Sequence, residues 1–160
     1  MVLLRKSIPQ NRNLKSAAEL NVSKYKENKL EYTLARNQPE IIGQLCEGFY
    51  LMQHQFNFEI SELVNVAYFK FSHRWVRLYF EPLMVFWGEG DAPLEPINTD
   101  LENLLVLVNL NEMNGIVGSV LKSVEYGVKE NNVLVSLAFE SGKTLVFAHS
   151  SESDATSIHC

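Results

Sequence analysis

Apolar and polar residues alternate most clearly between Ser123 and His149, near the C-terminal end of the chain. Every second position from Val133 to Phe139 carries a large apolar side chain, which is the period of a strand with one buried face. Polar residues at 129–132 and at 140–143 interrupt the pattern, and Gly142 suits a tight turn because it adopts positive φ without steric cost. The pattern therefore predicts three strands joined by two turns.

A similar pattern runs from Val66 to Trp87. The sequence VRLYFE at Val76–Glu81 matches VSLAFE at Val135–Glu140, and each is followed by a turn and a further apolar segment. A short alternating segment, Phe56–Ile60, predicts an additional edge strand. We interpret the two longer segments as a repeated three-stranded meander, so that together they would form one twisted six-stranded sheet or an open barrel.

Two segments have the features of helices. Between residues 39 and 53 apolar side chains recur at three- and four-residue spacing, and Pro39 suits the first turn of a helix. Leu101–Leu110 fits either a buried helix or a buried strand, because periodicity does not separate the two in short apolar runs. We favour a helix there because Thr99 or Asp100 can cap its first turn.

These elements predict a single domain over residues 1–160, in the α+β class, with an antiparallel twisted sheet packed by one or two helices. Residues 1–37 are expected to form a polar arm with short helices, and residues 38–160 the core, with a frayed tail after residue 150. A chain of 160 residues with 46% hydrophobic residues is long enough to bury such a core.

The net charge of −5 is distributed unevenly along the chain. Residues 1–40 carry eight Lys or Arg and four Glu, whereas residues 41–160 carry six Lys or Arg and fifteen Asp or Glu. No Lys or Arg occurs between Arg77 and Lys122, an interval that contains seven carboxylates. Such a surface would repel nucleic acid and attract a basic partner.

The sequence shows no clear membrane or targeting segment. No apolar run reaches the length of about 18 residues that a membrane span needs, and the apolar segment after Met1 is too short for a signal peptide. Cys46 and Cys160 lie far apart without metal-ligand spacing, so we expect free thiols. These features predict a reduced, cytoplasmic protein that binds no membrane.

Residue patterns typical of enzymes are weak. The four histidines lack paired ligand spacing, and Glu140–Thr144 lacks the first glycine of a phosphate-binding loop. Glu81 and Glu140 occupy equivalent turns of the two meanders, but carboxylates in turns are usually solvated. We therefore expect no catalytic residue, no metal site and no cofactor.

The acidic loop that follows Trp87 suggests a surface for a protein partner. An aromatic side chain beside carboxylates suits a basic protein surface, because the aromatic anchors the contact and the charges steer association. The alternative is a solvated acidic loop over an ordinary core. The residues that we expect to contact a partner are Glu81, Trp87, Glu89, Asp91, Glu95, Asp100 and Glu102.

The segment from Asn114 to Ser150 contains Phe139–Gly142, followed by Leu145 and Phe147, and it resembles the sheet of small bacterial immunity proteins. These include the immunity partners of contact-dependent growth-inhibition toxins and of other polymorphic toxins. The resemblance covers roughly the last quarter of the chain and carries no functional residue across by position. It implies a cytoplasmic, non-catalytic inhibitor that covers the active site of one toxin domain, often a basic nuclease.

Two other functions fit the residues. A small-ligand-binding or hydrolytic domain would use a concave face of the sheet, with Glu81, Arg77 or His149 inside it. A structural accessory subunit of a larger assembly would need no such site. An immunity protein that neutralises a toxin domain is the function that we favour from the sequence.

Overall fold

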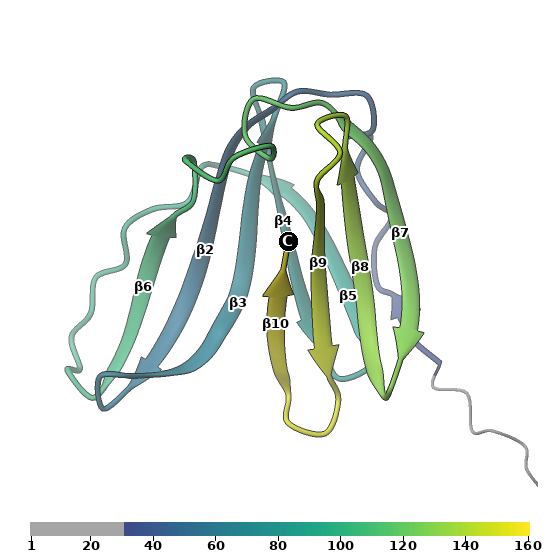
Figure 1. Ribbon diagram of the computed structural model, residues 1–160. Coiled ribbons are helices and arrows are strands. Elements are labelled where there is room, and N and C mark those ends of the chain that lie inside the picture. Colours follow the sequence, from purple (N-terminus) through teal and green to yellow (C-terminus); the bar gives the residue numbers. More distant parts are fainter. Residues whose placement is uncertain (1–30) are drawn as a thin grey trace, which may run out of the picture.

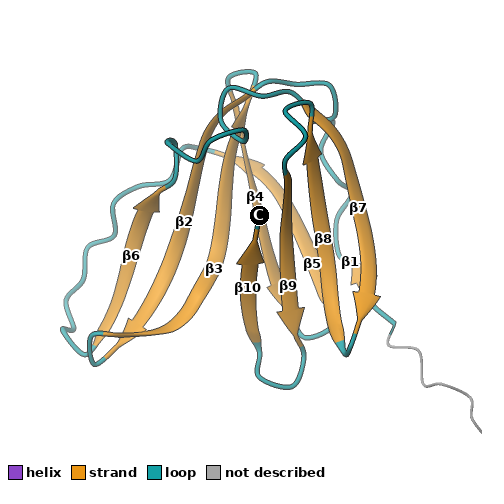
Figure 2. Cartoon of the chain, in the orientation of Figure 1, coloured by secondary structure: helices purple, strands orange, loops and turns teal. Residues whose placement is uncertain are grey.

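The structure, a computed structural model, describes residues 31–160, which form ten β-strands and no helix (Figures 1 and 2). This part of the chain is all-β, so the expected α+β class is wrong. Residues 1–30 of the expected polar arm lie outside the described residues. The strands are β1 (Thr33–Leu34), β2 (Cys46–Phe56), β3 (Glu59–Phe71), β4 (Arg74–Glu81), β5 (Met84–Gly90), β6 (Asn103–Asn109), β7 (Leu121–Lys129), β8 (Asn132–Phe139), β9 (Thr144–Ser150) and β10 (Ala155–His159).

The strands form two sheets that pack face to face. The first sheet has the order β1-β5-β4-β3-β2-β6, and the second has the order β10-β9-β8-β7. Neighbouring strands are antiparallel, except that β1 is parallel to β5. The second sheet lies over the part of the first that contains β4 and β5, whereas β2 and β6 lie to one side of it (Figure 1).

Aromatic side chains fill the space between the two sheets. Phe69 on β3 stacks on Phe49 of β2, with ring centroids 4.6 Å apart. The same ring meets Phe147 of β9 edge-on, at a centroid distance of 6.1 Å. All three side chains are completely buried. The core therefore joins residues that are almost 100 positions apart in the chain, from Phe49 to Phe147.

The helix expected at residues 39–53 is wrong, because β2 begins at Cys46 and runs through most of this segment. β2 lies between β3 and β6, and it has buried side chains on both faces, such as Leu51 on one and Met52 on the other. A strand that is covered on both faces loses the alternation of apolar and polar residues. Its apolar spacing then also satisfies a helix, and pairing with two neighbouring strands decides the structure.

The helix expected at Leu101–Leu110 is also wrong, since this segment forms β6 and pairs with β2. The carboxylate of Asp100 does accept a hydrogen bond from the backbone N–H of Glu102, at 2.8 Å, as a helix cap would. Here the bond closes a turn that leads into a strand. The apolar run after it favours the strand because β2 offers an edge with which it can pair.

The strands of both predicted meanders are confirmed, as β3-β4-β5 and β7-β8-β9. The single sheet or barrel that we expect from them is wrong, because they belong to different sheets. Phe56–Ile60 is not a separate edge strand; it is the turn between β2 and β3 with the adjoining strand ends. The tail after residue 150, expected to fray, contains β10, which pairs with β9.

The β2–β3 hairpin extends past its neighbours in the first sheet. Ala67 of β3 pairs with Leu78 of β4, so the first five residues or so of β3, beginning at Glu59, have no partner on β4. At about 3.3 Å per residue, this end projects roughly 15 Å beyond β4. β6 pairs with β2 along the projection, whose end lies at the lower left of Figure 1. We call this end the tip.

A candidate protein-binding surface at the tip

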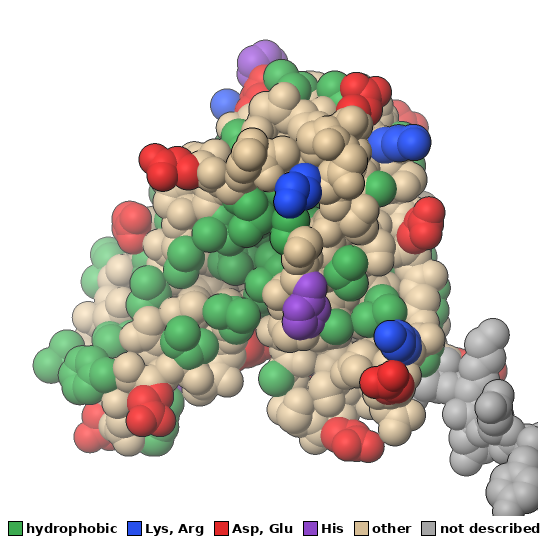
Figure 3. Space-filling model, in the orientation of Figure 1, with side chains coloured by type: hydrophobic (Ala, Val, Ile, Leu, Met, Phe, Trp, Pro, Cys, Tyr) green, Lys and Arg blue, Asp and Glu red, His purple; other side chains and the backbone are tan. Residues whose placement is uncertain are grey.

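Apolar side chains are exposed around the tip. Phe58 is 75% exposed and Leu101 is 71% exposed, and such clusters often mark interaction sites. The backbone N–H of Asn57 donates to the carbonyl oxygen of Glu102 at 2.8 Å, which holds the hairpin turn against the segment before β6. What we call the tip surface comprises Phe56, Phe58, Ile60 and Leu101 with the carboxylates Glu59, Asp100 and Glu102. Figure 3 shows hydrophobic and acidic side chains together at this end of the molecule.

Phe58 has a backbone conformation that bulky residues avoid. Together with Asn57 it forms a two-residue turn with φ values of 49° and 65°, the type I′ geometry in which glycine or asparagine is preferred. A left-handed φ at a residue with a Cβ costs about 1–2 kcal/mol. Because the ring is mostly exposed, burial within the described fold does not offset this cost. Residues with such strain cluster at binding sites, where the strained geometry serves the contact.

The strands of the tip come from two intervals of sequence that contain no Lys or Arg. The first lies between Arg36 and Lys70 and includes β2 with most of β3. The second lies between Arg77 and Lys122 and includes β6. Pairing of β2 with β6 places the two intervals side by side. The tip surface therefore carries negative charge that its own strands do not neutralise, and it would attract a basic partner.

Asp100 has a structural role within the tip surface. Its carboxylate accepts a hydrogen bond from the Asn103 side-chain amide at 2.7 Å and another from the Glu102 backbone N–H at 2.8 Å. These bonds favour the charged form and lower the pKa of Asp100 below its ordinary value. The carboxylates of Glu59 and Glu102 form no ion pair within the described residues, so they remain available to a partner.

The residues that we expect to contact a partner do not form one cluster. Asp100 and Glu102 belong to the tip surface. Glu89 lies near the end of β5, at the opposite end of the sheet from the tip. Asp91 and Glu95 are exposed on the loop between β5 and β6, which crosses from one end of the sheet toward the other (Figure 1).

Trp87 does not offer an aromatic anchor at the surface, and the expectation that it does is wrong. Its side chain is 1% exposed, and its indole N–H donates to the hydroxyl of Tyr126 on β7 at 2.8 Å. That hydroxyl donates in turn to the side chain of Gln38 at 2.7 Å. Burial raises the pKa of Tyr126 to about 12, so the hydroxyl stays neutral. The bond between Trp87 and Tyr126 connects the two sheets, and Gln38 extends it to the segment before β2.

The residues of the ligand-binding alternative are not brought together. Glu81 is exposed at the end of β4, where the chain turns into β5. Arg77 is exposed on the outer face of the first sheet, where it lies over Gly88. His149 is buried between the sheets. Glu81 at a strand end, Arg77 on the outer face and His149 in the core cannot contact the same substrate. These three residues therefore do not form a ligand-binding site.

His149 has polar neighbours in the core. Its Nδ1 lies 3.0 Å from the hydroxyl of Thr156, and its ring stacks on Phe80 with centroids 5.4 Å apart. Its Nε2 has no hydrogen-bond partner, and the carboxylate of Asp154 lies 3.6 Å away. Hydroxyl, imidazole and carboxylate suggest a catalytic triad, but the side chains of His149 and Thr156 are almost completely buried. Desolvation lowers the pKa of His149, and Asp154 acts in the opposite direction.

We expect the fold to lose stability in mild acid because of His149. The folded state favours the neutral ring, whereas the unfolded chain takes up a proton near pH 6.5. The stability linked to His149 is therefore complete above that pH, and it is lost as the pH falls through the lowered folded-state pKa. Urea denaturation at about pH 7.5 and about pH 5.5 should show a smaller change in His149→Gln than in the wild type.

Glu62 is a second titratable group in this part of the fold, and it does not disturb this comparison. Burial raises the pKa of Glu62, and the nearby charge of Asp154 raises it further. Its contribution is present in both proteins and cancels in the difference between them. Equal pH dependence of the wild type and His149→Gln would contradict the role of His149.

The described residues hold no group of three or more His, Cys, Asp or Glu that could bind a metal ion. Both cysteines are free; Cys160 is exposed, and burial raises the pKa of Cys46 to about 12, which makes that thiol unreactive. Within residues 31–160, no helix is long and apolar enough to cross a membrane.

Comparison with known proteins adds no family. No protein-family model, no curated protein and no solved structure matches this chain. The fold and the tip surface define the class only as a two-sheet β protein with an exposed acidic and apolar projection.

Sequence reasoning misses the apolar half of the tip surface. Phe56–Ile60 alternates like a short strand, and phenylalanine in a two-residue turn is not a typical signal. The available signal was the second interval without Lys or Arg, residues 37–69. Like residues 78–121, this interval contains carboxylates and no Lys or Arg. Two acidic segments of this kind form one surface when their strands pair.

Proposed function

We propose that this chain is an immunity protein that binds a basic toxin domain, such as a nuclease, through the tip surface and blocks its active site. One observation carries the proposal: a projecting hairpin presents exposed apolar side chains, including the strained Phe58, next to carboxylates that form no ion pair within residues 31–160. Apolar area at the centre and charge at the rim is the usual composition of a protein interface. The resemblance of the C-terminal segment to immunity proteins agrees with this function.

The shape of the tip suits insertion into a cleft. β6 and β3 pair with β2 on either side, out to Phe56, so the backbone that supports the tip is already ordered. An ordered surface loses little conformational freedom on binding. A nuclease holds a polyanion with Lys and Arg, and carboxylates at the tip can compete for those groups. Occupancy of the cleft then excludes the substrate without any catalysis by this chain.

Co-expression tests the proposal directly. The protein encoded immediately upstream is produced with and without this chain, and the purified material is analysed by native mass spectrometry. We expect a complex with equal numbers of the two chains and relief of the neighbour's toxicity. A neighbour whose toxicity is unchanged, and from which this chain separates on purification, would overturn the proposal.

Charge reversal shows which end of the molecule docks. In Glu59→Lys combined with Glu102→Lys, the tip changes sign while Asp100 keeps its structural bonds. We expect association with the toxin domain at low salt to slow by more than about tenfold, because steering charges act mainly on the association rate. Glu89→Lys with Asp91→Lys is the matched control at the opposite end, and it should slow association less. A control that slows association as much as the tip variant would exclude the tip as the docking surface.

A further inference from the structure

Edge strands expose unpaired backbone groups, and the described sheets end in β1, β6, β7 and β10. β1 has two residues and β10 has five. The outer edge of β6 is occupied at Leu105, whose N–H and C=O both bond the side chain of Asn98, at 2.8 and 2.9 Å. β7 has nine residues, and its outer edge is bonded at Leu121 to the segment before β2. The remainder of β7 has no strand partner on its outer side within residues 31–160.

The hydrogen bonds of β8 show which groups of β7 face outward. Phe139 of β8 donates its N–H to the carbonyl oxygen of Lys143, on the side of β9. Backbone groups along an antiparallel strand point alternately to one side and to the other. The residues of β8 that bond to β7 therefore include Ser136 and Leu134, which pair with Glu125 and Gly127 of β7. The residues between them point their N–H and C=O groups to the open edge. They are Val124, Tyr126 and Val128.

Open space lies beside this edge. A cavity of about 850 Å³ is lined by Tyr126, Gly127 and Val128 on β7 and by residues 31–34 around β1. A Cβ placed on Gly127 would meet no atom within 4 Å. The backbone of β7 between Tyr126 and Val128 therefore borders open space, with residues 31–34 on the far side of it.

The solvent face of β7 carries opposite charges at matched positions. Glu125 and Lys129 lie two residues on either side of Gly127, and both are exposed. Neither forms an ion pair within the described residues. An antiparallel strand of the same sequence, centred on Gly127, places its Lys129 opposite Glu125 and its Glu125 opposite Lys129. The edge is thus complementary to itself in one register.

We propose that two copies of this chain associate through β7, with Gly127 facing Gly127 of the second copy. Tyr126 and Val128 then exchange backbone hydrogen bonds with Val128 and Tyr126 of the second copy, and the two four-stranded sheets become continuous. A shift by two residues would place Glu125 opposite a neutral residue, so the two charge pairs select this register. The interface is isologous, and assembly therefore stops at the dimer.

Sedimentation velocity at increasing concentration tests the dimer. The wild type should approach twice its mass of 18.3 kDa. Glu125→Lys places two lysines opposite each other at both pairs, and Lys129→Glu does the same with two glutamates. Each variant should raise the dimer dissociation constant by about tenfold or more. Both side chains are exposed, so folding should be unaffected.

An equimolar mixture of the two variants is the decisive measurement. In the heterodimer every facing pair again has opposite signs, so we expect association to return to the wild-type level. A wild type that stays monomeric at all concentrations, or a mixture that associates no better than either variant alone, would overturn the dimer. β7 and the tip lie on different sides of the molecule (Figure 1), so toxin binding and dimerisation can fail separately.

Discussion

Replacing Phe58 by glycine is expected to stabilise the fold and to weaken binding to the partner. Glycine adopts a φ of 65° without the Cβ contact that costs about 1–2 kcal/mol in other residues. Glycine also has more conformational entropy in the unfolded chain, which offsets part of this stabilisation. The free energy of unfolding should therefore rise by about 0.5–1 kcal/mol. Binding should weaken by about thirtyfold or more, since a central aromatic contact is typically worth at least about 2 kcal/mol.

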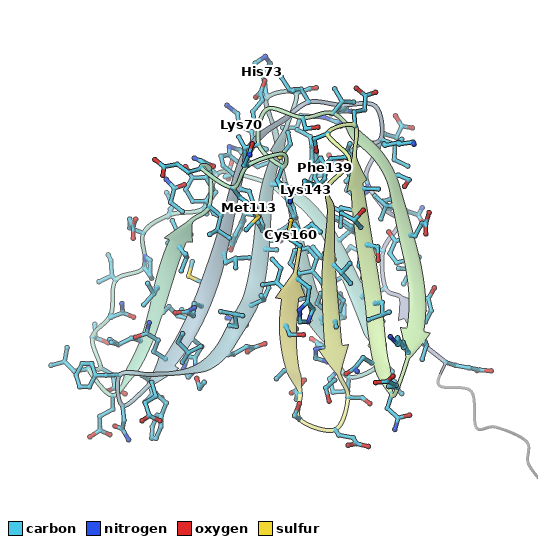
Figure 4. The ribbon with its side chains drawn as sticks, in the orientation of Figure 1. Lys70, His73, Met113, Phe139, Lys143 and Cys160 are labelled. Carbon is cyan, nitrogen blue, oxygen red and sulfur yellow. The ribbon has the colours of Figure 1, made fainter. Side chains whose placement is uncertain are left out.

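His73→Gly is the matched control for this substitution. His73 has a φ of 71° in the turn between β3 and β4, at the end of the sheet opposite the tip (Figure 4). Its backbone N–H donates to Glu47 at 3.0 Å, a bond that glycine keeps. The His73 ring also lies 3.2 Å from that carboxylate and is lost in the variant, but a contact of a side chain that is 85% exposed contributes little to stability. We expect a similar gain in stability, with unchanged affinity for the toxin domain. Chemical denaturation and titration calorimetry measure the two quantities.

The Phe58→Gly variant shows whether the strained backbone at Phe58 serves binding or folding, because the two roles predict different changes in stability and in affinity. If Phe58 contributed to the core, its loss would lower the free energy of unfolding. If it had no role, Phe58→Gly would gain stability and keep its affinity, as His73→Gly is expected to do. A substitution that raises stability and lowers affinity for the partner is expected only where the original residue contacts the partner and destabilises the fold.

Local turn chemistry is the part of this fold that the sequence predicts well. The turns at 129–132 and 140–143 are polar, short and flanked by alternating residues, and the structure places turns there. The information needed for each of them lies within a few neighbouring residues. The strands that these turns connect are predicted correctly for the same reason.

Sheet membership could not be predicted, because it depends on distant partners. β2 pairs with β6, more than 40 residues away, and its buried residues belong to a core that includes residues of β8 and β9. Without that pairing, the spacing of apolar residues in β2 fits a helix as well as a strand. The two meanders likewise repeat a local pattern and do not indicate which strands lie beside them.

Sequence reasoning names two carboxylates of the tip surface among the expected partner contacts, and it does not indicate the apolar part of that surface. Asp100 and Glu102 belong to the tip surface, as an acidic loop suggests, but Trp87 is buried because it closes the gap between β5 and β7. The sequence shows that Trp87 precedes an acidic loop, but it does not show whether its side chain lies on the buried or the exposed face of the strand. The exposure of Phe58 follows from a turn whose residues are unusual, so no common pattern identifies it.

Removal of the Phe69 ring is expected to cost about 3–5 kcal/mol of the free energy of unfolding, which is a large part of the total for a single domain. Phe69 is completely buried, and it stacks on Phe49 at 4.6 Å within the first sheet. Its edge contact with Phe147, at 6.1 Å, connects that sheet to the second. Phe69→Ala therefore opens a cavity where the two layers meet, and Phe69→Leu provides a milder variant if the alanine variant does not fold.

Tyr79→Ala is the matched control on the outer face of the first sheet. Tyr79 stacks on Phe86 with centroids 4.7 Å apart and an interplanar angle of 6°, close to the geometry of Phe49 and Phe69. Both rings of the outer pair are only partly buried, because they alternate with buried residues that face the core. We expect a loss of about 1 kcal/mol from Tyr79→Ala. Losses of equal size at the two sites would contradict the assignment of an inner and an outer face.

A double-mutant cycle between Phe69→Leu and Phe147→Leu measures whether the two sheets share one core. The rings touch edge-on across the layers, so a coupling energy of about 0.5–1.5 kcal/mol is expected. The same cycle between Phe69→Leu and Phe86→Leu should give no coupling, since Phe86 belongs to the outer pair. If the first coupling were also absent, each sheet would be stabilised separately and two unfolding transitions should appear. A shared core instead requires both sheets to unfold together in a single transition, because neither covers its apolar face without the other.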